Sequence, residues 1–161
     1  MAIFHPFPPF YDPQSRILIL GSFPSVRSRE THFYYGHPQN RFWKVVAMLL
    51  GENVPVTLDD KIQLLHTHHI ALWDVAASCD ITGSADSTMK CTHYNDIRPI
   101  LRHCPIERIG VNGKTAAKFY RKGILPMTGK TACELPSTSP ANAAWSLQKL
   151  MDAWRPFICN P

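Results

Sequence analysis

The sequence predicts a three-layer α/β/α sandwich around a central, mostly parallel four-stranded sheet. Short apolar runs, typical of buried parallel strands, alternate along the chain with segments of helical periodicity. The 161 residues, of which 45% are hydrophobic, suffice for one core and leave no room for two. We therefore expect residues 1–161 to form a single domain.

The chain should open with an irregular surface segment, because residues 1–14 contain four prolines. Four later segments predict strands, since each is a short apolar run that ends near Gly, Pro or a polar residue. These segments are residues 16–20, 70–75, 108–112 and 132–135.

Five further segments predict helices. In residues 40–50 the apolar side chains follow the spacing of an amphipathic helix, with Asn40 as a candidate cap and Gly51 as the stop. The other predicted helices are residues 59–66, 94–102, 114–121 and 142–154, and we expect a long polar loop between residues 76 and 92.

The formal charge of +5 favours a polyanionic partner such as DNA. The five cysteines show no Cys-x-x-Cys spacing, which argues against a disulfide framework or a zinc ribbon. His66, His68 and His69 lack a carboxylate or fourth ligand at a fixed spacing, so we expect no metal. No segment has the features of a signal peptide or a membrane span, and we expect a cytoplasmic protein without membrane contact.

Three predicted loops follow strands and should open on the same edge of the sheet. They begin at Gly21, Asp74 and Pro136, and an aromatic run, residues 33–43, follows the first of them. Arg27 and Arg29 border the first loop, where cations can hold phosphates beside a pocket that stacks a base. A serine hydrolase is disfavoured because the chain has no Gly-x-Ser-x-Gly elbow. The candidate site residues on these segments are Gly21, Ser22, Phe23, Tyr34, Tyr35, Asn40, Trp73, Asp74, Ser137 and Ser139.

At these residues the sequence resembles the uracil-DNA glycosylase superfamily. Gly21-Ser-Phe-Pro-Ser25 stands in the place of the first motif, and Tyr35-Gly-His-Pro-Gln-Asn-Arg-Phe-Trp43 is similar to a long and specific family run. Gly83-Ser-Ala-Asp86 resembles a stretch of the thymine-DNA glycosylase branch, and Ser137-Thr-Ser-Pro-Ala-Asn142 an altered second motif. The resemblance covers about residues 16–150.

Two departures from the family pattern point to the hypoxanthine-DNA glycosylase branch. Phe23 occupies the slot of the Asp or Asn that positions water, and Ser137 replaces the His or Asn of the second motif. The resemblance therefore implies a monofunctional, cofactor-free and monomeric glycosylase that removes hypoxanthine from double-stranded DNA. The alternatives are a uracil or thymine mismatch enzyme and a non-catalytic binder of damaged DNA.

The resemblance also implies roles for single residues. Asn40 either orients the attacking water or only caps a helix, and both interpretations stay open. Gly21, Ser22, Phe23, Tyr35, Trp73 and Asp74 are expected to bind the base, and Asp74 can accept a hydrogen bond from the N1–H of hypoxanthine. Arg27, Arg29, Ser137, Thr138, Ser139 and Asn142 are expected to contact DNA, with residues 141–145 as a wedge.

Overall fold

The four predicted apolar segments form a parallel sheet in the computed structural model, which describes residues 2–80 and 90–159. The strand order is β3-β2-β6-β7, and every neighbouring pair is parallel. Gly21 and Asp74 are register partners at the carboxyl ends of two neighbouring strands. The strands are β2 (Ile17–Gly21), β3 (Ile70–Asp74), β6 (Arg108–Asn112) and β7 (Cys133–Leu135).

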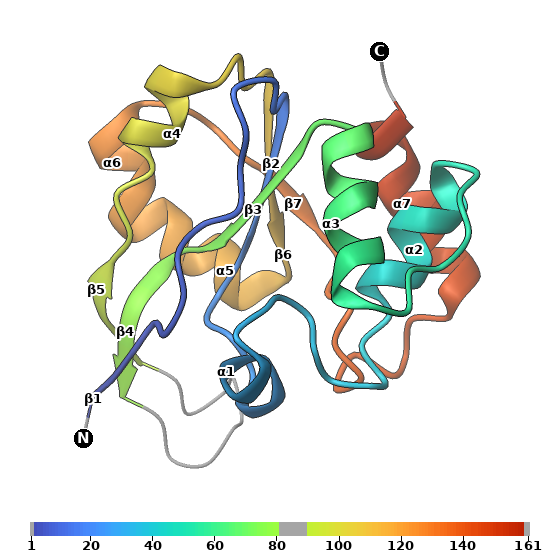
Figure 1. Ribbon diagram of the computed structural model, residues 1–161. Helices are drawn as coiled ribbons and strands as arrows, with labels where there is room; N and C mark the ends of the chain where they lie inside the picture. Colours follow the sequence, from blue (N-terminus) through green and yellow to red (C-terminus); the bar gives the residue numbers. More distant parts are fainter. Residues whose placement is uncertain (1, 81–89, 160–161) are drawn as a thin grey trace.

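Helices cover both faces of this sheet, which confirms the predicted layered α/β architecture (Figure 1). Because side chains alternate along a strand, Ile17 and Ile19 pack on one side and Leu18 and Leu20 on the other. The first side is covered by α2 (Phe42–Leu49), α3 (Leu58–Thr67) and α7 (Leu147–Cys159), and the second by α4 (Arg98–His103), α5 (Lys114–Phe119), η2 (Tyr120–Ile124) and α6 (Leu125–Thr128).

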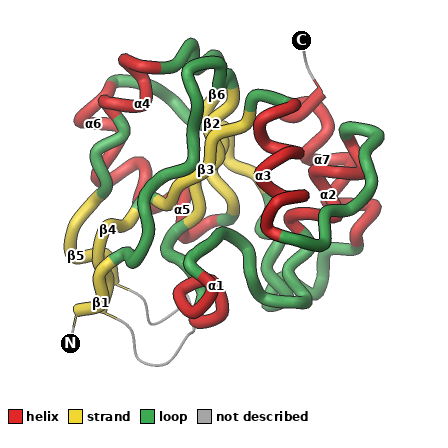
Figure 2. The backbone as a smooth tube through the Cα atoms, viewed as in Figure 1, coloured by secondary structure: helices red, strands yellow, loops and turns green. Residues whose placement is uncertain are grey.

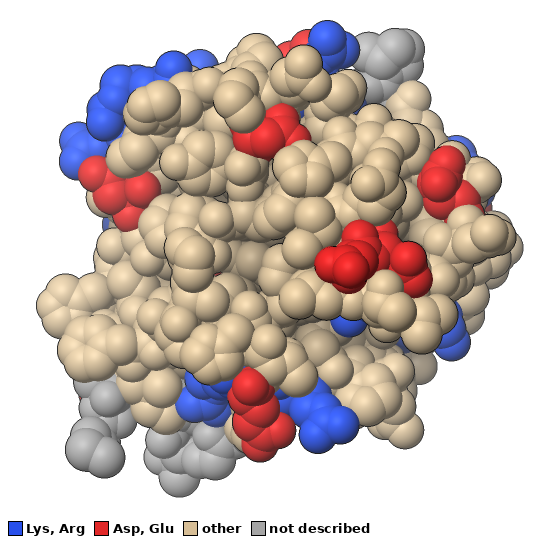
Figure 3. All heavy atoms as spheres, viewed as in Figure 1, with Lys and Arg blue, Asp and Glu red and all other residues tan. Residues whose placement is uncertain are grey.

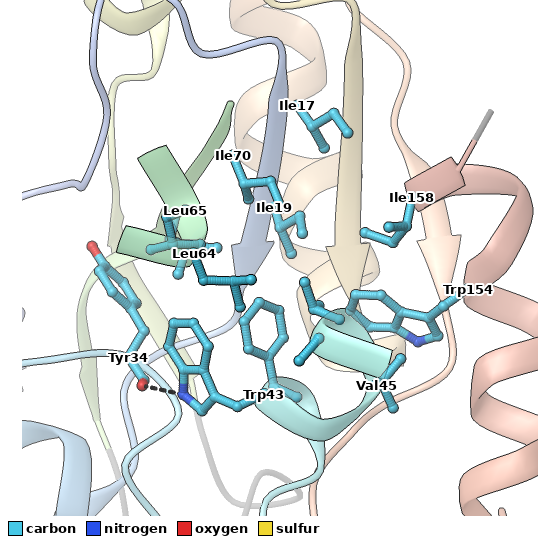
Figure 4. Close-up of a cluster of buried hydrophobic side chains, with 14 of the residues drawn as sticks. Ile17, Ile19, Tyr34, Trp43, Val45, Leu64, Leu65, Ile70, Trp154 and Ile158 are labelled. Carbon is cyan, nitrogen blue, oxygen red and sulfur yellow. Dashed lines mark hydrogen bonds between the residues drawn. The ribbon is translucent and has the colours of Figure 1, made fainter. Parts of the chain in front are cut away.

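The core on the first side is rich in aromatic rings (Figure 4). Trp43 and Trp154 are buried there, and the indole Nε1 of Trp43 donates to the Tyr34 carbonyl at 3.3 Å. This contact ties the aromatic run before α2 to the helix itself. The core thereby holds the segment that carries the candidate site.

The prediction of a loop after residue 75 was wrong for the described residues at its two ends, because they form strands of a second, antiparallel sheet (Figure 2). Its strands are β1 (Ala2–Phe4), β4 (Ala76–Asp80) and β5 (Lys90–Tyr94), in the order β1-β4-β5. The strand β5 is mostly exposed, and its polar side chains hid the strand from hydrophobic patterning. The helix expected from residue 94 begins at Arg98 instead.

Another helix boundary differs from the prediction by several residues, and one short helix was not predicted. The last helix begins at Leu147 and not at residue 142, because Asn142 and its neighbours form a turn in which Trp145 N–H donates to the Asn142 carbonyl. A short helix that patterning missed, α1 (Val26–Thr31), follows the first strand loop. Ser25 caps it, since its hydroxyl accepts the Ser28 N–H at 3.1 Å.

Candidate active site

A cavity of about 140 Å³ opens at the carboxyl edge of the parallel sheet. Its walls come from the carboxyl ends of β2, β3 and β6, the loops after β2 and β7, helix α1 and the segment between α1 and α2, as expected for a parallel α/β sheet. The predicted residues that line it are Gly21, Ser22, Phe23, Arg29, Tyr34, Tyr35, Asn40, Asp74, Ser137, Thr138 and Ser139.

The carboxylate of Asp74 lies in the cavity wall, and Gly21 lets it approach. Asp74 is 4% exposed, and a Cβ added at Gly21 would stand 2.4 Å from Asp74 Oδ1. Asp74 Oδ2 lies 2.8 Å from His5 Nε2. His5 Nδ1 accepts the Phe7 N–H at 3.4 Å, so the ring proton is on Nε2 and is donated to the carboxylate. Sequence patterning missed His5 because its segment read as irregular surface.

Tyr35 lines the same side of the cavity, with its backbone in the left-handed region at a φ of 53°. One face of its ring stacks on Phe42, with centroids 4.0 Å apart. The Tyr35 hydroxyl is buried, and its proton has no acceptor within hydrogen-bond geometry among the described residues. Burial, and then the charge of Asp74, raise the pKa of Tyr35 well above its usual range, while the nearby Asn112 side chain, acting as a donor toward the phenol oxygen, lowers it by less and offers no acceptor for the hydroxyl proton. The hydroxyl therefore keeps its proton and can donate.

Phe23 gives the cavity an apolar wall where the family pattern has a water-positioning residue. Its ring is 7% exposed, and the guanidinium carbon of Arg29 lies 5.8 Å from the ring centroid. A cation at this distance is attracted by the ring face. Lys and Arg side chains also lie at the edge where α1 lies, on both sides of an acidic group, at the bottom of Figure 3. This edge therefore offers positive charge beside the cavity.

Asn40 belongs to a hydrogen-bonded chain that crosses the cavity wall. Its Oδ1 accepts the Phe42 N–H at 2.9 Å and the Thr138 hydroxyl at 2.8 Å. The backbone donor fixes which end of the amide is oxygen. The Thr138 hydroxyl accepts in turn from Asn112 Nδ2 at 3.0 Å. Asn112 was not predicted, although it ends a predicted strand at the edge where ligands bind.

This chain of contacts changes two predictions. Helix α2 begins at Phe42 with Arg41 as its N-cap residue, so Asn40 lies one position earlier but still binds a first-turn N–H. Thr138 is fully buried and its hydroxyl both donates and accepts within the protein. The predicted phosphate contact through the Thr138 hydroxyl does not fit this arrangement.

The loop after β7 is held in place by Arg41, which sequence reasoning left without a role. The Arg41 guanidinium donates to the carbonyls of Ser139, Asn142 and Trp145, and the first two lie at 3.3 and 3.0 Å. Asn142 Nδ2 donates to the Ser137 carbonyl at 3.0 Å. Asn142 thus shapes the loop and does not line the cavity, while Trp145 is exposed on the segment predicted as a wedge.

Two other predicted site residues lie outside the lining formed by the described residues. Trp73 precedes Asp74 on β3, so the two side chains point to opposite faces, and Trp73 packs against hydrophobic core. Arg27 is exposed and lies 3.7 Å from Glu30 on the same helix.

Other predictions concern metals, membranes and a stretch that the structure leaves out. Within residues 2–80 and 90–159, no group of three His, Cys, Asp or Glu could hold a metal ion. His66 instead lies 2.6 Å from the Asp12 carboxylate. Over the same ranges, no helix has the length and apolar character needed to cross a membrane. The predicted motif at residues 83–86 lies outside the described residues.

The sequence model of the uracil DNA glycosylase superfamily matches residues 8–157. The chain belongs to this superfamily. Two similar curated proteins are both named hypoxanthine DNA glycosylase. The protein from Methanosarcina acetivorans is 35% identical over 87% of this chain and 89% of its own length. The protein from Methanosarcina barkeri is 32% identical over 92% of this chain and 93% of its own length.

A solved structure agrees with this membership. It is the solution NMR structure of a candidate uracil DNA glycosylase from Methanosarcina acetivorans, with a TM-score of 0.79 and 33% sequence identity. The alignment covers 96% of this superfamily member and 98% of the solved chain. The predicted resemblance is thereby confirmed over nearly the whole chain.

Proposed function

We propose that this protein is a monofunctional DNA glycosylase that hydrolyses the N-glycosidic bond of deaminated bases, with hypoxanthine as the preferred base. The observation that carries this proposal is a buried carboxylate, Asp74, in the wall of an aromatic cavity at the carboxyl edge of the sheet. The two Methanosarcina relatives support the choice of base through their names.

Asp74 suits hypoxanthine because of how deamination changes adenine. Adenine presents N1 as an acceptor, which a carboxylate repels, whereas hypoxanthine presents an N1–H donor. An ionised carboxylate accepts hydrogen bonds only, so Asp74 favours the deaminated base. Burying that charge is costly without a partner, and His5 and the bound base both supply donors.

The substrate reaches this cavity after the damaged nucleotide swings out of the duplex, because the anomeric carbon is otherwise inaccessible. Arg29 lies beside the cavity and Arg27 nearby on the same helix, where both can hold phosphates. Ser137 and Ser139, on the loop after β7, also line the cavity. Trp145, exposed on the loop that Arg41 braces, is suited to fill the gap left by the flipped base.

Hydrolysis needs a positioned water, and Asn40 is the residue we assign to it. Both contacts to Asn40 Oδ1 come from the protein, so the amide Nδ2 is the end left to donate to the water oxygen. The second lone pair of that oxygen attacks C1′, the C1′–N9 bond breaks, and the proton lost by the water ends on the base. Ser22 and Phe23 line the cavity, and we assign their backbone N–H groups to the departing base, a kind of contact worth about 3–4 kcal/mol.

The phenyl ring of Phe23 bears on the two alternative functions, the mismatch glycosylase and the non-catalytic binder. A phenyl ring cannot orient water, so an enzyme that relies on the first motif for this step, as a uracil or thymine mismatch glycosylase does, would be impaired. The same ring is compatible with a non-catalytic binder of damaged DNA. Turnover therefore separates our proposal from the binder, and base preference separates it from the mismatch enzyme.

The test uses the purified protein and labelled duplexes with one inosine, xanthine or uracil at the same position. We expect abasic sites at inosine fastest, and strand breaks only after alkali, because no lyase step is proposed. Faster cleavage at uracil would favour the mismatch enzyme. Binding to the inosine duplex without any abasic product would show a binder in place of an enzyme.

A further inference from the structure

The Tyr35 hydroxyl and the Asp74 carboxylate meet at one point of the cavity wall. A Cβ placed on Gly21 would lie 2.4 Å from Asp74 Oδ1 and 3.5 Å from Tyr35 Oη. The Tyr35 hydroxyl is buried, and its proton has no acceptor within hydrogen-bond geometry among the described residues. A buried donor without an acceptor is unfavourable, so this position favours a ligand that accepts its proton.

The two groups form a pair of opposite character. Asp74 Oδ1 accepts hydrogen bonds, while the Tyr35 hydroxyl keeps its proton because burial and the nearby charge raise its pKa. The stacking of Tyr35 on Phe42 fixes the direction of the ring, with centroids 4.0 Å apart and planes inclined by 17°. The pair is therefore held before any ligand arrives.

His5 binds the carboxylate oxygen of Asp74 that does not face Gly21. Its Nε2–H binds Asp74 Oδ2 at 2.8 Å, which turns the other carboxylate oxygen toward Gly21. The imidazole is itself caged by rings, with Phe7 at 4.6 Å and Phe23 at 5.9 Å between centroids, and both side chains of the His5–Asp74 pair are 5% exposed. Rotation of the carboxylate would break this buried, charge-assisted hydrogen bond, so the carboxylate is held in this orientation.

A donor beside an acceptor matches the keto and N–H edge of a deaminated base. Hypoxanthine presents O6, which accepts, next to N1–H, which donates. Adenine presents the reverse, an amino donor next to the N1 acceptor, and would leave both protein groups unsatisfied. We propose that Tyr35 Oη and Asp74 Oδ1 together read the keto and N–H edge, with His5 as the positioning residue that presents Asp74. This assignment rests on the proposed function and gives the polar end of Tyr35, and not its ring face, the contact with the base.

The test measures binding as well as cleavage. The probes are duplexes with 2′-fluoro-2′-deoxyinosine or 2′-fluoro-2′-deoxynebularine, which resist hydrolysis; nebularine lacks both O6 and N1–H. The wild-type protein should prefer the inosine duplex. Tyr35→Phe should reduce this preference about three- to tenfold, and His5→Phe about tenfold or more, by the loss of one neutral and one charge-assisted hydrogen bond.

Two variants separate recognition from folding. His5→Gln keeps a donor at the same distance along the side chain and should retain most of the preference. Tyr120→Phe makes the same change as Tyr35→Phe but removes a structural bond, from Tyr120 Oη to the Lys130 carbonyl at 2.7 Å. It should lower the unfolding midpoint and leave the preference unchanged, whereas Tyr35→Phe should not lower the midpoint.

Each result decides one of the two proposals. If Tyr35→Phe and His5→Phe both keep the wild-type preference for the inosine duplex, base recognition by Tyr35 and Asp74 is refuted, even if the wild-type protein excises hypoxanthine. Equal binding of both probes by the wild-type protein overturns it as well. If the preference falls in these variants but the wild-type protein cleaves no inosine duplex, base recognition by Tyr35 and Asp74 is supported and the proposed hydrolysis is refuted.

Discussion

The role of Asn40 can be tested with two substitutions that affect different ends of its amide. Asn40→Ala removes both contacts to Oδ1, from Phe42 N–H and from the Thr138 hydroxyl. At about 0.5–1.5 kcal/mol for each net hydrogen bond, the free energy of unfolding should fall by about 1–3 kcal/mol. Asn40→Asp keeps an oxygen for both contacts and removes only the Nδ2 donor, so the stability should change little.

Turnover should respond differently from stability. If Nδ2 positions the attacking water, both variants lose that contact, and the single-turnover rate on inosine DNA should fall about a hundredfold or more. That loss corresponds to about 2.7 kcal/mol of transition-state stabilisation. The assay is single-turnover excision at saturating protein, beside urea unfolding of the same preparations.

Two results would refute this reasoning. An Asn40→Asp variant as active as the wild-type protein would show that the amide acts on the water through an acceptor and not through Nδ2. An Asn40→Ala variant that loses activity only as far as it loses folded protein would reduce Asn40 to a structural role at the start of α2.

Three further substitutions test the surroundings of the cavity. Gly21→Ala places a Cβ 2.4 Å from Asp74 Oδ1 and should displace the carboxylate, so the single-turnover rate of excision should fall about tenfold or more. A wild-type rate would show that the carboxylate position is unimportant. A lysine at position 41 cannot bind the three carbonyls of the loop after β7 together. Arg41→Lys should therefore lower DNA affinity, measured by fluorescence anisotropy, and the free energy of unfolding by about 1–3 kcal/mol, measured with urea. Unchanged affinity would show that DNA binding does not need these contacts. Arg29→Ala should slow excision and reduce the slope of log affinity against log salt concentration by about one. Arg27 lies outside the cavity lining, so Arg27→Ala should weaken DNA binding without slowing excision. Equal effects of the two variants on the excision rate would contradict the separate placement of the two arginines.

The parallel sheet could be predicted because its strands are buried on both faces. Residues 17–20 are apolar without interruption, and such a run has few other interpretations in a chain that alternates with helices. The antiparallel sheet could not be predicted in this way. Its strand β5 is largely exposed, so its pairing with β4 depends on tertiary contacts such as the hydrogen bond between the Ser78 and Thr92 hydroxyls at 2.6 Å.

The candidate site, like the fold, could be predicted from the sequence only in part. Residues at the carboxyl ends of predicted strands, such as Gly21 and Asp74, could be predicted because ligands bind at that edge of a parallel sheet. His5 lies 69 positions before its partner Asp74, and no local pattern links the two. Arg41 stood in a recognised motif, but its role depends on a loop about 100 residues later. Contacts between distant segments are therefore what the sequence alone left undetermined.

The most direct test of the central claim is the release of free base. The wild-type protein is incubated with two duplexes that differ only in carrying inosine or adenosine at one position, and the released base is identified by mass spectrometry. The account predicts free hypoxanthine from the first duplex, no adenine from the second, and a strand that breaks only after alkali. Absence of hypoxanthine, with the duplex bound, would contradict it.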